Sequence, residues 1–189
     1  MKYDSMHDSE LIEKINASGE SFWFGILYDR HEKLVYNKCL SMLKNQTDAE
    51  DLTHDIFIKV FVSLKQFKGA SQFKTWLFSI TYNFCISFLR KKKTLPITAE
   101  ENVPDSADET ALEIEDKAFL NLKIELLRWA LEEIKPDEKA ILFMKYQDDM
   151  SLKDISEALE LTESAVKMRL KRAKEKVALL CKNNKIQES

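Results

Sequence analysis

Residues 94–116 limit the fold of this chain more than any other segment. They contain no Lys or Arg, eight Asp or Glu residues, two prolines and few large apolar side chains. A segment with low hydrophobicity and charge of one sign cannot bury enough apolar surface to form a core. We therefore expect a flexible acidic linker that joins two separately folded domains, at residues 9–93 and 117–182.

Both flanking segments are predicted to be helical. The chain has only three Gly and three Pro among 189 residues, whereas sheet proteins need many turns. Apolar residues recur every three or four positions in residues 9–45 and again after residue 116, which is the period of an amphipathic helix. The sequence predicts an all-α fold with two small helical domains, a helical bundle followed by a helix-turn-helix domain.

The net charge of −3 hides an uneven distribution. Residues 1–93 carry 14 basic and 11 acidic residues, and residues 117–189 carry 15 and 13. These segments contribute +3 and +2, and the linker contributes −8. Two positively charged domains are compatible with an anionic partner such as nucleic acid, although the whole chain is acidic.

Residues 56–93 combine positive charge with aromatic rings. They hold eight basic residues, no acidic residue and nine of the 19 aromatic residues of the chain. This composition is typical of single-strand nucleic-acid platforms, where cations follow phosphates and rings stack on bases. The alternative interpretation is a buried helix pair, with its rings in the core and its lysines in solvent.

Caps and breaks divide this part of the chain. Residues 47–50 match a capping box, which predicts that Thr47 opens a helix over about residues 48–66. On that helix Asp51, His54 and Asp55 form a polar face that could meet a basic partner. A loop is predicted around Gly69, with Ser71 capping a helix that ends in the basic residues 90–93.

The C-terminal segment has the plan of a helix-turn-helix. Ser151 and Asp154 match a capping box, and Thr162 is expected to cap a second, basic helix. The N-terminal half of such a helix meets base edges in the major groove. The candidates for base contact are Ser164, Lys167, Met168 and Lys171, and those for phosphate contact are Arg172 and Lys174. The alternative is a solvated basic surface helix.

The sequence predicts neither an enzyme nor a cofactor or metal site. It has no Ser/Cys–His–Asp set and no Gly-rich phosphate loop, and His7, His31 and His54 lack partners at metal-ligand spacing. Three widely spaced cysteines suggest reduced thiols in a cytoplasmic protein. No apolar run approaches the roughly 20 residues that span a bilayer, so we expect no membrane insertion.

Several strings resemble those of one known family. Residues 48–57 (DAEDLTHDIF), 67–77 (FKGASQFKTWL) and 90–93 (RKKK) resemble region 2 of the extracytoplasmic-function (ECF) group of bacterial sigma factors. Residues 151–156 (SLKDIS) and 166–173 (VKMRLKRA) resemble region 4 of the same group. The resemblance covers about residues 20–180 and includes the order of the domains and the acidic linker.

The resemblance implies a sigma factor that binds core RNA polymerase, through its clamp helices and flap, and directs it to promoters. The first domain would capture and melt the −10 element, the second would recognise the −35 duplex, and the linker would enter polymerase channels. It also implies a possible anti-sigma partner. The implied polymerase-binding residues are Asp51, His54, Asp55 and Lys59. The implied −10 residues are Lys68, Ser71, Gln72, Phe73, Lys74, Thr75, Trp76, Arg90, Lys91 and Lys92.

The chain also departs from the family pattern. Ala70 stands where many relatives have Asp, Ser87 and Phe88 stand where relatives often have Asp and Glu or His, and Met168 replaces a usual Ser. The promoter preference of relatives therefore cannot be transferred, and Met168 suggests an apolar contact to a thymine methyl. A stand-alone helix-turn-helix regulator is the alternative function; it explains residues 151–177 but not the composition of residues 56–93.

Overall fold

The computed structural model describes residues 5–69, 71–93 and 124–187. The chain divides after Lys93 into two compact units, and each is described by itself. The described residues form helices and turns without a strand, which confirms the all-α prediction. The predicted linker, Ala70 and the start of the predicted second domain lie outside the described residues.

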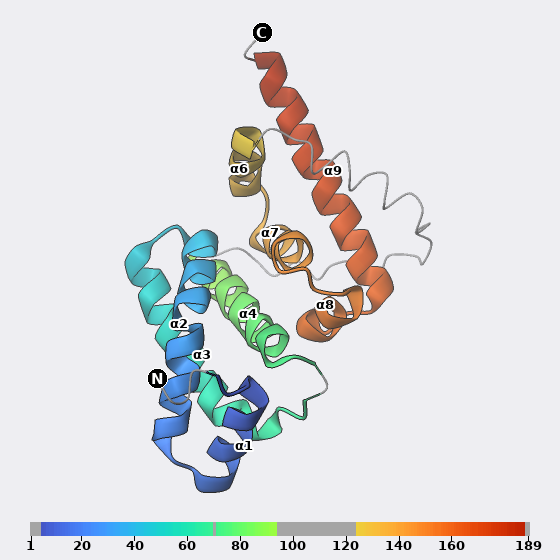
Figure 1. The fold of residues 1–189 in the computed structure, drawn as a ribbon. Helices are drawn as coiled ribbons and strands as arrows, with labels where there is room; N and C mark the ends of the chain where they lie inside the picture. Colours follow the sequence, from blue (N-terminus) through green and yellow to red (C-terminus); the bar gives the residue numbers. More distant parts are fainter. Residues whose placement is uncertain (1–4, 70, 94–123, 188–189) are drawn as a thin grey trace. The chain divides into compact units, whose positions relative to one another are not determined.

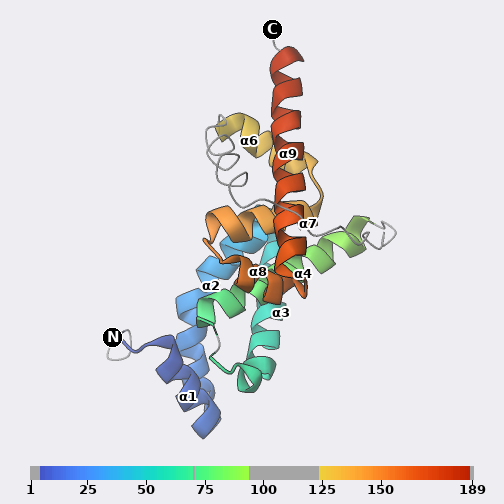
Figure 2. The same ribbon diagram turned by 90° about the vertical axis from the view of Figure 1, so that its right-hand side faces the viewer.

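The first unit is built around one long helix. Its elements are α1 (Asp8–Ser18), α2 (Ser21–Leu43), α3 (Gln46–Ser63), the short 3-10 helix η1 (Leu64–Gln66) and α4 (Phe73–Lys93). Helix α2 contacts α1, α3 and α4, and α1 also contacts η1. Figures 1 and 2 show α1 beside α2.

Only some of the aromatic rings of residues 56–93 lie in the core of the first unit. Among these nine rings, those of Phe57, Phe73, Phe78 and Tyr82 are buried. Phe61 is exposed, and the others are half-buried. The apolar side chains around them include Leu27, Val35, Cys39, Ile56, Val60, Leu77 and Cys85. The burial alternative is therefore correct for four rings, and the remaining five keep some accessible surface.

The predicted start of α3 was wrong by two residues. Asn45 is the N-cap, and its side-chain oxygen accepts a hydrogen bond from the Asp48 amide at 2.9 Å. Asn is as good a cap as Ser or Thr, so the box beginning at Thr47 lies inside the helix. The predicted Ser71 cap is also displaced, because the Trp76 amide bonds to the carbonyl of Gln72 at 3.2 Å.

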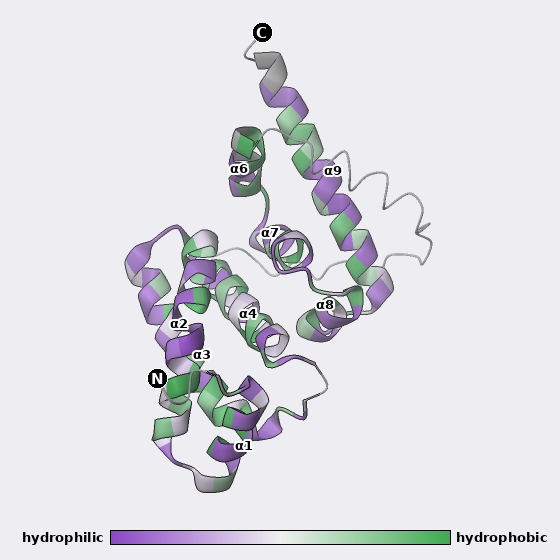
Figure 3. Ribbon diagram, in the orientation of Figure 1, coloured by the Kyte–Doolittle hydropathy of each residue, from purple (hydrophilic) through white to green (hydrophobic). Residues whose placement is uncertain are grey.

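The second unit packs three helices against a fourth. Its elements are α6 (Ile124–Glu133), α7 (Pro136–Leu142), the π-helical turn η2 (Phe143–Gln147), α8 (Leu152–Leu159) and α9 (Glu163–Gln187). Helix α9 contacts α6, α7 and α8. The core side chains include Ile134, Ile141, Met144, Ile155, Val166, Leu170 and Val177. Hydrophobic and hydrophilic residues alternate along the helices in Figure 3, as amphipathic helices require.

Local signals in the sequence explain where the helices of the second unit begin, and the predicted caps at Ser151 and Thr162 are confirmed. Pro136 opens α7 at its first turn, where its missing N–H costs no hydrogen bond. Ser151 and Asp154 form the capping box of α8. The Thr162 hydroxyl accepts a hydrogen bond from the Ala165 amide at 3.2 Å at the start of α9. These caps fix the N-terminal ends of α8 and α9, the two helices of the helix-turn-helix.

Candidate nucleic-acid interface

An aromatic cluster closes the base of the loop between η1 and α4. The ring centroids of Phe67 and Phe73 lie 5.8 Å apart, and the Trp76 ring lies 5.2 Å from Phe67 and 5.8 Å from Phe73. Contacts at these distances stabilise beyond the area that they bury. Because Phe67 precedes the loop and Phe73 follows it, the cluster holds the two ends of the loop together.

The loop itself presents polar side chains. Lys68 and Gln72 are exposed, and Ser71 and Trp76 are half-buried. Phe73 is only 5% exposed, because Phe67, Trp76 and His31 surround its ring. Of the residues predicted at this loop, Phe73 therefore lies in the core of the free chain and has little surface to offer to DNA.

Helix α4 carries the predicted cations at both of its ends. Lys74 is exposed in the first turn, beside the half-buried Thr75. Arg90, Lys91 and Lys92 are exposed in the last turns. At 1.5 Å per residue, Lys74 and Arg90 are about 24 Å apart along the axis. The loop and the basic end of α4 thus form two separate cationic patches on one helix.

One face of α3 is polar in its first half and apolar in its second half. Asp51, His54 and Asp55, which were predicted to form a polar face, are exposed. The same face continues with Ile58, which is 63% exposed, and Val62, which is 68% exposed. We missed these two residues, although their spacing from Asp55 (i+3 and i+7) places them on the same side of the helix. Exposed apolar side chains grouped in this way mark interaction surfaces.

Lys59 and Phe61 flank this face. Lys59 is exposed, and Phe61 is 47% exposed with its ring 4.8 Å from that of Phe24 in α2. The buried side of α3 is formed by other residues, including Leu52, Ile56 and Val60. Helix α3 is therefore apolar on two sides, and only one of them is covered within the first unit.

The helix-turn-helix has the geometry that the sequence predicted. Helix α8 ends at Leu159, Glu160 adopts a left-handed conformation (φ 53°), and the Leu161 amide bonds to the Ser156 carbonyl at 2.9 Å. This turn leads directly into the capped start of α9. The two helices are thus joined by a short turn with hydrogen-bonded ends.

The predicted base-reading residues share one face of α9. Ser164, Lys167, Met168 and Lys171 follow the spacing i, i+3, i+4 and i+7, and all are partly exposed. Val166, Leu170 and Ala173 are buried on the opposite side. Arg172 is exposed, but Lys174 is only 3% exposed. The structure therefore brings the predicted set together except for Lys174, whose buried side chain has little access to a phosphate.

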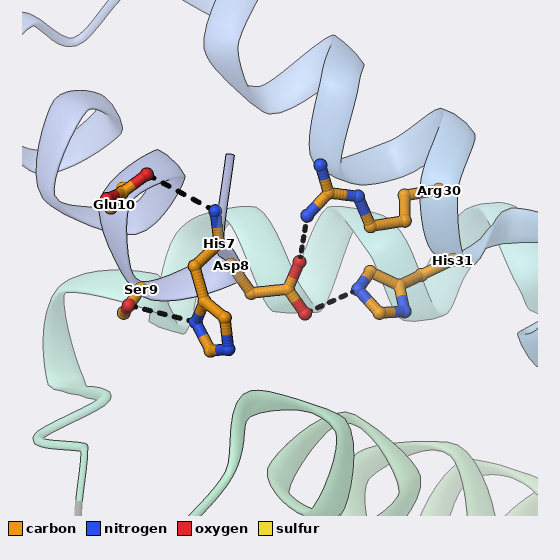
Figure 4. A network of polar contacts seen from close by, with 6 residues as sticks. All are labelled: His7, Asp8, Ser9, Glu10, Arg30 and His31. Atoms are coloured by element: carbon orange, nitrogen blue, oxygen red, sulfur yellow. Dashed lines mark hydrogen bonds and ion pairs between the residues drawn. The ribbon is translucent and has the colours of Figure 1, made fainter. Parts of the chain in front are cut away.

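A polar network that the sequence analysis missed ties α1 to α2. One carboxylate oxygen of Asp8 lies 2.6 Å from Nη1 of Arg30, and the other lies 2.8 Å from Nε2 of His31 (Figure 4). Burial acts to raise the pKa of Asp8, but hydrogen bonds and charge from His31 and Arg30 outweigh it and lower that pKa. His31 thus helps to hold α1 against α2, and no local sequence signal connects it with Asp8, 23 positions away.

Two classes of site are absent from the described part of the chain. Its His, Cys, Asp and Glu side chains form no group that could hold a metal ion. Within the same residues, no helix combines the length and the apolar character needed to cross a membrane.

Two family models match the two units. The Sigma-70 region 2 model matches residues 27–94, and the Sigma-70 region 4 model matches residues 124–177. Together these segments cover well over half of the 189 residues. Both matches coincide with the units that carry the cationic loop and the helix-turn-helix.

Curated relatives match along most of the chain. The ECF RNA polymerase sigma factor SigW of Bacillus subtilis is 28% identical over 175 residues, covering 83% of this chain and 88% of the relative. SigX of the same organism is 28% identical over 148 residues, covering 76% of each chain. The ECF sigma-E factor of Haemophilus influenzae is 25% identical and covers 97% of both chains.

Solved structures share the fold. CnrH, in complex with the cytosolic domain of CnrY, has a TM-score of 0.62 at 23% identity and covers 93% of this chain and 97% of that chain. RpoE of Bartonella quintana, in complex with the anti-sigma factor NepR, has a TM-score of 0.58 at 20% identity and covers 84% and 96%. A stand-alone helix-turn-helix regulator is not favoured, because it leaves the region 2 match unexplained. The chain belongs to the ECF group of sigma-70 factors, the subunits that associate with RNA polymerase and direct it to specific promoters.

Proposed function

We propose that the two units divide the work of promoter recognition. The first unit binds core polymerase and captures the opened −10 element, and the second unit reads the −35 duplex. The observation that carries this proposal is the presence, in one chain, of a cationic loop inside the region 2 match and a basic helix-turn-helix inside the region 4 match. A regulator that only binds duplex DNA needs the second feature alone.

The loop has the chemistry needed to hold an unpaired base. The Gln72 amide and the Ser71 hydroxyl both donate and accept hydrogen bonds, so they suit the Watson–Crick edge of a base. Lys68 and Lys74 neutralise the adjacent phosphates, and the half-buried Trp76 ring offers a surface for stacking. Extruding a base costs a few kcal/mol, which these contacts offset. Phe73 packs against Phe67 and Trp76 at the base of the loop. Thr75 lies next to Trp76 at the start of α4.

The basic end of α4 extends the same interface. Arg90, Lys91 and Lys92 are exposed and add phosphate contacts to those of the loop. Such contacts carry no sequence information but fix the register of the strand. Sequence preference at the −10 element therefore comes from the loop.

The exposed face of α3 is the proposed polymerase contact. Its acidic half, with His54, suits a basic partner, and Ile58 and Val62 suit the apolar side chains of a partner helix. Lys59 at its edge can pair with an acid of the partner. A face that combines exposed apolar side chains with neighbouring charged ones has the composition of a protein interface.

The second unit is proposed to place the start of α9 in the major groove. Lys167 and Lys171 can donate to guanine, Met168 can contact a thymine methyl, and Ser164 can bond to several bases. Arg172 faces solvent and suits a phosphate. Lys174 would first have to become exposed.

Further parts of the proposal rest on the family. The acidic segment 94–116 occupies a basic channel of the polymerase, and an anti-sigma factor binds the chain, as NepR binds RpoE of Bartonella quintana. In this proposal the protein acts as a specificity subunit rather than as an enzyme, and it works in the cytoplasm, where polymerase meets the chromosome. It needs no cofactor.

In vitro transcription with purified core polymerase on a genomic promoter library tests the function. The expected result is initiation from a limited set of promoters only when the chain is added. A parallel pull-down should retain the chain on core polymerase. Tight, specific binding to promoter duplex without any association with polymerase would instead support the stand-alone regulator.

A further inference from the structure

Helix α1 lies outside both family matches but contacts the part of the first unit that holds the loop. The matches begin at residue 27, whereas α1 spans Asp8–Ser18 and contacts both α2 and η1. The 3-10 helix η1 leads directly into the loop at Phe67. Helix α1 can therefore influence the loop through its contacts with α2 and η1, although it lies outside the segments that the family models match.

Asp8, the first residue of α1, fixes one side of His31. An ionised carboxylate only accepts hydrogen bonds, so Nε2 of His31 carries the proton that points to Asp8 across 2.8 Å. Arg30 holds the second carboxylate oxygen at 2.6 Å, and Figure 4 shows Asp8 between the two partners. The carboxylate that orients the imidazole is therefore itself held in place by Arg30.

The ring of His31 then contacts the aromatic cluster. Its centroid lies 5.3 Å from that of Phe73, with the two planes at 64°. His31 is 6% exposed and Phe73 is 5% exposed. Buried side chains are close-packed and transmit small displacements to their neighbours. A continuous set of contacts thus runs from α1 through His31 and Phe73 to both ends of the loop.

We infer that Asp8 and His31 are positioning residues for capture of the −10 strand. Asp8 orients the imidazole, the imidazole sets the Phe73 ring, and Phe73 sets the spacing of the loop ends on which Lys68 and Gln72 stand. This inference rests on the proposed function of the loop. It adds α1, a helix outside the region 2 match, to the promoter-opening apparatus of this chain.

The test uses the full chain in complex with core polymerase. Binding of a fluorescent single-stranded −10 non-template oligonucleotide is measured for the wild type and for Asp8→Ala, and binding of a −35 duplex is measured in parallel. Asp8→Ala should weaken single-strand binding about tenfold, as expected when supporting contacts are displaced, and leave duplex binding and polymerase association unchanged. Glu13→Ala, an exposed acid on the same helix, is the matched control and should change none of them.

Two further variants separate positioning from simple stability. His31→Phe keeps a ring against Phe73 but removes the donor to Asp8, so its effect and that of Asp8→Ala should be non-additive. The emission of Trp76, measured with Trp23 and Trp129 replaced by Phe, should shift in Asp8→Ala while circular dichroism stays constant. Additive effects, or single-strand binding and Trp76 emission equal to those of the wild type, would overturn the inference.

A loop variant separates failure of this inference from failure of the proposed function. If Gln72→Ala weakens single-strand binding but Asp8→Ala does not, the loop captures DNA and only the positioning role of α1 is wrong. If Gln72→Ala and Lys68→Ala both leave binding unchanged, the proposed role of the loop fails, and the positioning role fails with it.

Discussion

The ammonium of Lys92, near the end of α4, lies 2.6 Å from a carboxylate oxygen of Asp48 in the first turn of α3. The Lys92 side chain is 58% exposed, and exposed ion pairs contribute only about 0.2–1 kcal/mol. Lys92 also lies 5.7 Å from the centroid of the Phe88 ring. A cation held this weakly can exchange Asp48 for a phosphate when DNA arrives.

Asp48→Asn is therefore expected to raise the affinity for DNA slightly. Removing the competing carboxylate should strengthen binding of the −10 strand about two- to threefold at low salt, with little change in stability, because the pair is weak. Titration of the polymerase complex with the labelled strand measures this. Glu50→Gln, which removes an exposed acid from the same helix, should change the affinity less, and weaker binding by Asp48→Asn would contradict the proposed competition.

Phe73→Ala should mainly lower stability. The ring is buried against three others, and truncation of a buried Phe costs about 3–5 kcal/mol. Urea unfolding of the full chain measures the loss. Trp76→Ala removes a half-buried ring and should lower stability less while reducing promoter opening more. A folded Trp76→Ala variant that opens promoters normally would exclude stacking on this ring.

The double variant Ile58→Glu/Val62→Glu should weaken binding to core polymerase at least tenfold. It places two charges at the apolar half of the α3 face without touching the buried side of the helix. Gel filtration or fluorescence titration with core polymerase gives the affinity. Leu179→Glu is the matched control, because Leu179 is 59% exposed and lies beyond both family matches. An equal loss of affinity in both variants would mean that added negative charge, and not the α3 face, causes the effect.

Lys167→Ala and Lys171→Ala should weaken −35 duplex binding by about 1–3 kcal/mol where they read bases. Arg172→Ala should instead reduce the steepness of the plot of log binding constant against log salt concentration by about one, because one phosphate contact is lost. Binding isotherms over a range of salt concentrations distinguish the two roles. Lys182→Ala, an exposed cation further along α9, is the control. Loss of polymerase binding in these variants would contradict the division between the two units.

The Asp8 network should make stability depend on pH at acidic values. The pKa of folded Asp8 lies below its ordinary value of 3.8, so the unfolded chain takes up this proton first as the pH falls. The stabilisation from ionised Asp8 is fully present above its ordinary pKa of 3.8. It disappears as the pH falls through the lower pKa of the folded state. Asp8→Asn should therefore be less stable than the wild type by about 1 kcal/mol near neutral pH, and urea unfolding should show this difference shrinking below about pH 4. A constant difference would mean that the charge of Asp8 does not contribute.

Local signals in the sequence determined much of the architecture. The Ser151 box, the Thr162 cap and Pro136 act within one helical turn, so their meaning does not depend on distant residues. The same holds for the shared face of Ser164 and Lys167, which follows from the helical period. The strings of regions 2 and 4 likewise indicated the family before any fold was known.

Tertiary structure alone decided which faces are covered. Composition could not tell that Phe73 is enclosed while Ile58 is exposed, because burial depends on helices that are distant in sequence. The Asp8–His31 pair, 23 positions apart, and the burial of Lys174 have the same origin. A helix carries its own period and caps in its sequence, but the neighbours that pack against each side arrive only when the chain folds.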